Sequence, residues 1–100
     1  MFIAMNRFRI APARAAEFVE VWRQRDSHLK SVPGFQGFHL LRGPETEEYV
    51  LFASHTQWAS RAHFEDWTRS DAFRKAHAGA GQTRDLYLGP PQLELFEAVI

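Results

Sequence analysis

Three side chains in this sequence lie where a hydrophobic core would not need them, and each could do chemistry. Asn6 falls on the apolar face of a predicted strand, Arg25 on the apolar stripe of a predicted helix, and His77 at the end of a second helical region. A buried amide without partners costs about 1–3 kcal/mol. An amide or a guanidinium at such a place can contact a ligand, and an imidazole can bind a metal cofactor.

Each of these residues also has an ordinary structural explanation. Asn6 can bond to a neighbouring backbone group. Arg25 can snorkel or form a salt bridge, and His77 can pair with the negative end of a helix dipole. Trp67 forms a cluster with Phe64, three residues before it, and an aromatic pair of this kind is usually core. The residue types alone leave these alternatives open.

A break in the second helical region would bring two of the candidates together. Trp67 and His77 are ten residues apart, so in one unbroken helix they would point about 80° apart. Ser70 can cap a new short helix, on which Phe73 and His77 share a face. A break at Ser70 would therefore let the side chains of Trp67 and His77 face one cleft.

Composition excludes several classes of function. The 100 residues allow one domain, and 12 Lys and Arg balance 12 Asp and Glu, so no basic excess is present to bind nucleic acid. The absence of cysteine excludes disulfides, thiolate metal sites and cysteine nucleophiles. The five histidines form no HxxxH or HExxH pair. No segment has the length of a membrane span or the form of a signal peptide, so we expect a soluble, cytoplasmic protein without membrane partners.

Alternation and helical periodicity predict the elements that must position these side chains. The predicted strands are Phe2–Ile10, Phe35–Arg42, Glu48–Trp58 and Leu93–Ile100. The predicted helices are Ala13 to about Lys30, Arg61 to about Arg69, and Asp71 to about Ala78. The order β-α-β-β-α-β is that of the α+β, ferredoxin-like fold, an antiparallel sheet with its helices on one face.

Strands two to four carry apolar residues on both faces. Alternation assigns Phe35 and Leu41 to one face of the second strand and Phe38 and Leu40 to the other. Helices cover only one face of such a sheet, so the other needs a different cover. We therefore expect a homodimer with its sheets packed face to face.

Asn6 together with the run HFEDWTRSDAFRKAH resembles the haem-degrading monooxygenases of the IsdG/MhuD type. These belong to the antibiotic-biosynthesis-monooxygenase (ABM) group. Within this group, the sequence looks most similar to the rhizobial haem oxygenases HmuQ and HmuD. The resemblance covers the whole chain, and its most specific part is D-W-x-x-S-x-x-F-x-x-A-H, from Asp66 to His77. The family's Asn, Trp and His triad maps onto Asn6, Trp67 and His77.

The resemblance implies a single ABM domain over residues 1–100, forming a dimeric α+β barrel with one haem per subunit. His77 would ligate the iron and leave a site for O₂, Asn6 would donate its amide N–H toward the oxygen, and Trp67 would ruffle the porphyrin. Haem would then be both cofactor and substrate. Contacts with haem are also expected from Phe64, Phe73 and Arg25, the last of these through a propionate.

The expected product is a biliverdin-type tetrapyrrole with release of iron. Electrons would come from an external donor, a reductase or a small-molecule reductant, because no flavin or nicotinamide motif is present. The segment from Ala78 to Pro90 is expected to act as a mobile lid.

Two other functions stay open at this point. One is a cofactor-independent, quinol-type monooxygenase of the same fold, which would oxidise an aromatic substrate without haem. The other is a non-catalytic haem carrier, which would share His77 and the cleft. A carrier has little need for a ruffling Trp67 or a polar Asn6.

Overall fold

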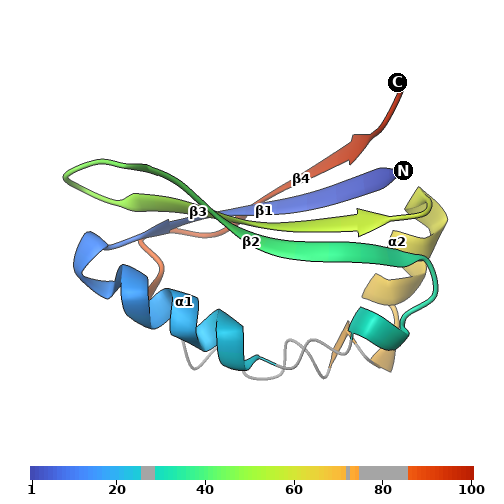
Figure 1. Cartoon of the computed structure of the whole chain (residues 1–100), viewed down its shortest axis with the longest axis horizontal. Coiled ribbons are helices and arrows are strands. Elements are labelled where there is room, and N and C mark those ends of the chain that lie inside the picture. The colour runs from blue at the N-terminus through green and yellow to red at the C-terminus, as the bar shows by residue number, and fades with distance from the viewer. Residues whose placement is uncertain (26–28, 72, 75–85) are drawn as a thin grey trace.

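A computed structural model describes residues 1–25, 29–71, 73–74 and 86–100. The described strands form one four-stranded antiparallel sheet in the order β2-β3-β1-β4, and both main helices lie on one face of it (Figure 1). The strands are β1 (Phe2–Ile10), β2 (Phe35–Glu45), β3 (Val50–Trp58) and β4 (Gln92–Glu97). The helices are α1 (Ala15–Gln24), α2 (Arg61–Thr68) and two short 3₁₀ turns, η1 (Pro12–Arg14) and η2 (Leu29–Ser31). This arrangement confirms the predicted ferredoxin-like α+β fold.

The alternation of β1 is confirmed. Phe2, Ala4, Phe8 and Ile10 are buried on the helix-covered face, each at most 6% exposed. β1 pairs with β3 on one side and with β4 on the other. Asn6 therefore lies in the middle of the sheet, on the same face as these core residues.

The first helix is shorter than periodicity predicts. Pro12 begins η1, as expected of a proline in a first turn. However, α1 ends at Gln24, and Arg25 adopts an extended conformation with φ −73° and ψ 126°. Leu29 lies in the separate turn η2, where its side chain is buried. The predicted continuous helix to Lys30 is therefore wrong, and Arg25 lies at the end of a helix instead of on its apolar stripe.

Two hydrophobic clusters fill the space between the sheet and the helices. The first lies under α1 and comprises Phe8, Ile10, Ala15, Phe18, Val50, Phe52 and Leu86. The second lies under α2 and comprises Phe2, Ala4, Leu29, Trp58, Phe64 and Trp67. Asn6 is placed on β1 between these two clusters, because Ala4 belongs to the second and Phe8 to the first.

A β-bulge corrects one predicted face of β2. Phe35 is paired with Trp58, and Gly37 with the next residue, Gln57, so the register shifts between them. Phe35 consequently packs edge-on against Trp58 with ring centroids 5.8 Å apart, on the same face as Phe38. Sequence alternation places Phe35 on the opposite face because it cannot count the extra residue of a bulge.

Serine caps begin the segments around α2, as the sequence predicts. The hydroxyl of Ser60 accepts a hydrogen bond from the His63 backbone N–H, at 3.3 Å, and the hydroxyl of Ser70 accepts one from the Phe73 N–H, at 3.2 Å. α2 ends at Thr68, which confirms a break close to Ser70. Most of the predicted helix from Asp71 to Ala78 lies outside the described residues.

The described end of the predicted lid is anchored to the core. Leu86 is 1% exposed within the first cluster. Tyr87 forms a β-bridge with Ile10, and the Leu88 N–H donates to the Arg9 carbonyl at 2.9 Å. A lid reaching to Pro90 is therefore wrong, because this part of the chain is packed and hydrogen-bonded.

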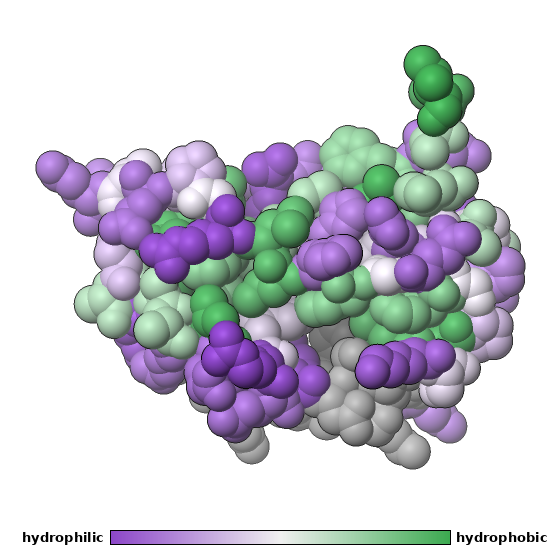
Figure 2. Space-filling view, viewed as in Figure 1, coloured by the Kyte–Doolittle hydropathy of each residue, from purple (hydrophilic) through white to green (hydrophobic). Residues whose placement is uncertain are grey.

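Apolar side chains remain exposed on the sheet and at the C-terminus. Leu41 is 41% exposed and Phe96 46%. Val99 and Ile100 are almost fully exposed, and the C-terminal end of the chain projects as a hydrophobic tip (Figure 2). None of the helices in the described ranges is long and apolar enough to span a membrane.

Candidate functional site

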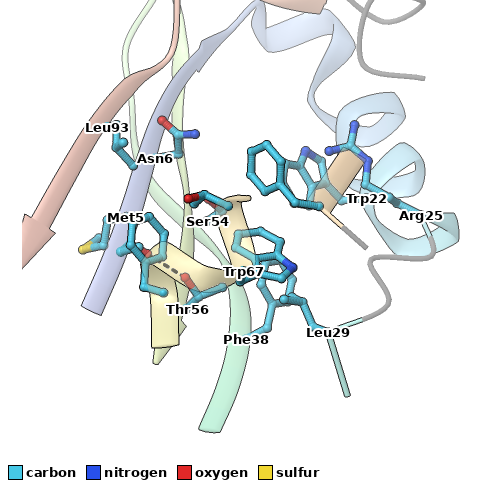
Figure 3. Close-up of a pocket in the computed structure, with 14 residues that line it drawn as sticks. Met5, Asn6, Trp22, Arg25, Leu29, Phe38, Ser54, Thr56, Trp67 and Leu93 are labelled. Atoms are coloured by element: carbon cyan, nitrogen blue, oxygen red, sulfur yellow. Dashed lines mark hydrogen bonds between the residues drawn. The ribbon is translucent and has the colours of Figure 1, made fainter. Parts of the chain in front are cut away.

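A pocket of about 270 Å³ opens between the helix-covered face of the sheet and the two helices. Figure 3 shows strand residues on one side of it and the indole rings of Trp22 and Trp67 on the other. Its lining residues are Ala4, Met5, Asn6, Trp22, Arg25, Leu29, Phe38, Ser54, Thr56, Phe64, Trp67, Thr68, Phe73 and Leu93. Most of these side chains are apolar, so the pocket suits a largely hydrophobic ligand.

Flat aromatic rings form two walls of the pocket. Trp22 of α1 stacks on Phe38 of β2, with ring centroids 5.8 Å apart and an interplanar angle of 13°. On the α2 side, Phe73 meets Trp67 edge-on, at 4.8 Å and 83°. Walls of this kind favour a flat, conjugated ligand, which can pack against ring faces and edges.

Trp67 belongs to the core as well as to the pocket. It is 8% exposed, and its ring lies 5.3 Å from that of Trp58 and 6.4 Å from that of Phe64. The structural explanation that the sequence left open for Trp67 is therefore correct, and it holds together with a place in the pocket wall.

We expect Trp67→Ala to destabilise the fold by about 3–5 kcal/mol, because it deletes a buried indole. Trp67→Phe keeps an aromatic ring in the cluster, so its cost should be clearly smaller. Urea unfolding of the apoprotein measures both. A Trp67→Ala variant within 1 kcal/mol of the unchanged protein would contradict this packing role.

Two of the hydroxyl groups around the pocket are already engaged. The Thr56 hydroxyl donates to the Ala4 carbonyl at 3.1 Å, and the Thr68 hydroxyl donates to the Glu65 carbonyl at 2.7 Å. Asn6 and Ser54 are the other polar strand residues among the described lining. Both are half-buried, and they are direct cross-strand partners. The side of the pocket formed by β1 and β3, here called its floor, thus presents the carboxamide of Asn6 and the hydroxyl of Ser54.

Sequence reasoning missed Ser54. Ser54 stands beside His55 on one strand, but the two cannot form a catalytic pair because neighbours on a strand face opposite ways. The signal that could have found Ser54 is its position in the alternation of β3, on the face of Phe52 and Thr56. That signal becomes informative only with the register that sets Ser54 opposite Asn6.

Arg25 supplies positive charge at the edge of the pocket. Its guanidinium lies over the Trp22 ring, 4.4 Å from the ring centroid, a cation–π contact that favours this orientation. An arginine beside an apolar pocket suits a ligand that is hydrophobic in its body and carries a carboxylate.

The structure brings together five of the six residues that the sequence singles out. Asn6, Arg25, Phe64, Trp67 and Phe73 all line the pocket. His77 lies outside the described residues. Within the described ranges, no three His, Asp or Glu side chains gather closely enough to hold a metal ion.

The described lining of the pocket fits haem in its chemistry. Haem is flat and apolar over most of its surface, matching the rings of Trp22, Phe38 and Trp67. Its two carboxylates match the charge of Arg25. The polar floor offers hydrogen bonds to a small ligand that shares the pocket.

Comparison with known proteins points to one family. The model of the antibiotic biosynthesis monooxygenase family matches residues 1–79. A curated relative from Bacillus thuringiensis (strain Al Hakam), named heme-degrading monooxygenase, is 27% identical over 88 residues, covering 88% of this chain and 81% of its own.

Solved structures agree with that match. The heme-degrader MhuD of Mycobacterium tuberculosis, solved with two hemes in its active site, is 27% identical with a TM-score of 0.76, covering all of this chain and 97% of its own. A putative antibiotic biosynthesis monooxygenase from Caulobacter crescentus is 25% identical with a TM-score of 0.72, covering 99% of this chain and 90% of its own.

Proposed function

Because the chain belongs to the antibiotic biosynthesis monooxygenase family and resembles its IsdG/MhuD branch, we propose that it degrades haem. The observation that carries this proposal is the pocket itself. Aromatic walls, an arginine at the rim and two polar side chains on the floor match a flat, carboxylated macrocycle with a small ligand beside it. The names of the relatives support the same substrate.

We assign the roles as follows. Haem, when bound, supplies both the iron that activates O₂ and the porphyrin carbon that is oxidised. His77 would hold the iron through one imidazole nitrogen. Asn6 would donate its amide N–H on the pocket floor, and Trp67, held by the second cluster, would press on the porphyrin and ruffle it. Phe64 and Phe73 keep Trp67 in place and exclude water.

The proposed reaction needs electrons from outside the protein, from a reductase or a small-molecule reductant. It consumes O₂ and gives a biliverdin-type tetrapyrrole, free iron and water, and the excised meso carbon leaves as a one-carbon product. The pocket contributes position, hydrogen bonding and exclusion of water, which are the usual contributions of a protein to cofactor chemistry.

An absorbance titration with haemin, followed by ascorbate in air with catalase present, tests this function. A saturable Soret shift should appear and then decay as a bilin band rises and iron is released. Catalase removes free peroxide, which destroys haem without enzymatic chemistry. A Soret band that stays stable with a competent reductant would indicate a haem carrier. No shift at all would favour the haem-free, quinol-type monooxygenase.

Arg25→Ala is expected to weaken haem binding by about tenfold, because a charge-assisted hydrogen bond is worth about 1.5–3 kcal/mol and this side chain is only half-buried. Arg25→Lys keeps the charge but loses the planar, two-pronged geometry, so its affinity should fall between the two. The same haemin titration measures both. Equal affinity of Arg25→Ala and the unchanged protein would rule out a propionate contact.

We also propose that the chain, a single ABM domain over residues 1–100, forms a homodimer. The helices cover one face of the sheet, and apolar side chains such as Leu41 and Phe96 remain exposed. A second copy packed face to face would cover them. Sedimentation equilibrium distinguishes one chain from two.

A further inference from the structure

One transverse row of the sheet crosses the pocket floor. It runs over all four strands through Leu40, Ser54, Asn6 and Leu93, each paired with the next. The outer two members are apolar and the central two are polar. Directly opposed residues have Cβ atoms about 4.5–5.5 Å apart, so the hydroxyl and the carboxamide can reach the same small ligand.

The next row on the same face of the sheet contains a hydroxyl that has only a structural role. In that row Thr56 lies opposite Ala4, and its hydroxyl bonds back to the Ala4 carbonyl at 3.1 Å. Thr56 is 8% exposed and its hydrogen-bonding capacity is used within the sheet. Ser54 lies two residues away on the same face, but it lines the pocket half-buried, and no such bond to the sheet is made by its hydroxyl within the described residues.

Figure 3 shows how the two polar side chains lie. The nitrogen of the Asn6 carboxamide points toward the side where Trp22 and Arg25 lie, and the Ser54 side chain stands between Asn6 and the Trp67 ring. A ligand between these walls would therefore have Asn6 on one side of the floor and Ser54 beside it, nearer to Trp67.

We propose that Ser54 is a second hydrogen-bonding residue for the small ligand that shares the pocket with haem. Its hydroxyl contacts that ligand directly, beside the Asn6 amide, instead of acting only through Asn6. This inference rests on the proposed function. The inference adds a polar contact from β3 to that function, so that side chains of two strands, β1 and β3, hold the small ligand.

The chain offers a matched pair of variants for the test. Ser54→Thr keeps the hydroxyl, and Ser54→Val has nearly the same shape as threonine without it. Both are β-branched and suit a strand. Ser54→Ala removes the hydroxyl without adding volume. The difference between the threonine and valine variants therefore isolates the hydrogen bond from packing.

The readout is the cyanide affinity of the haem-loaded protein, because the outer nitrogen of bound cyanide accepts a hydrogen bond. A haemin titration comes first. With a Soret shift in every variant, the valine and alanine variants should bind cyanide about threefold to tenfold more weakly than the threonine variant, the worth of one hydrogen bond. The threonine variant should stay within about twofold of the unchanged protein.

Three results would overturn the inference. Equal cyanide affinity in all variants would remove Ser54 from the ligand contact while leaving the haem function standing. Loss of the Ser54 effect in an Asn6→Ala background would show that Ser54 acts only through Asn6. A lack of haem binding in the unchanged protein would overturn the proposed function first, and this inference with it.

Discussion

Asn6→Ala is expected to bind haem with nearly unchanged affinity and to degrade it at least about 100-fold more slowly. Removing one well-placed hydrogen-bond donor from an active site typically costs about 10²–10³ in rate. The structure supports this size of effect because Asn6 lies on the pocket floor between two apolar clusters, where water competes weakly. Stopped-flow absorbance of the haem-loaded protein with reductant and O₂ measures the rate.

The isosteric variant Asn6→Asp separates donation from shape. An ionised aspartate has the outline of asparagine but no N–H to donate, so it should lose the reaction as fully as Asn6→Ala. Cross-strand pairing with Ser54 and Leu93 uses only the backbone of Asn6, so neither variant should disturb the sheet. Wild-type turnover in Asn6→Asp would rule out the donor role.

His77→Ala is expected to lose productive ligation of haem, and with it turnover. The iron would then lack the one protein ligand that the proposal gives it. Absorbance should show free or loosely bound haemin instead of the shifted Soret band. Added imidazole should restore part of that shift in the variant, since it supplies the missing donor atom.

A second histidine serves as the control for His77. His63 lies on α2, with its Nδ1 2.8 Å from the Ser60 hydroxyl, and it does not line the pocket. His63→Gln should therefore keep the Soret shift and the turnover. Unchanged turnover in His77→Ala would show that another group ligates the iron, and a search among the remaining histidines would follow.

Local pattern predicted the elements well and their contacts less well. The alternation of β1 placed Asn6 on the correct face, because the strand period is fixed by backbone geometry. The serine caps were found because a side-chain oxygen near the start of a helix has a specific use. Strand register was not readable from local pattern, so the pairing of Asn6 with Ser54 emerged only from the assembled sheet.

The errors have the same physical origin. The bulge at the start of β2 moved Phe35 to the other face, and a single extra residue leaves no clear mark on an alternating pattern. The stripe through Arg25 and Leu29 continues the helical period, but the chain leaves the helix at Arg25 and buries Leu29 from a separate turn. Both residues still line the pocket, so the incorrect helix prediction did not change their place in the candidate site.

Described residues on both sides of the stretch that contains His77 pack against the rest of the protein. Phe73 is held against Trp67 on one side, and Leu86 and Tyr87 are held by the core and by Ile10 on the other. These contacts are made by described residues alone, and Leu86 is 1% exposed within the first cluster. Substitutions within residues 75–85 should therefore leave both of these anchoring contacts in place. The family model ends at residue 79, inside this stretch. Chimaeras that swap it between relatives should fold, and could carry differences in chemistry from one scaffold to another.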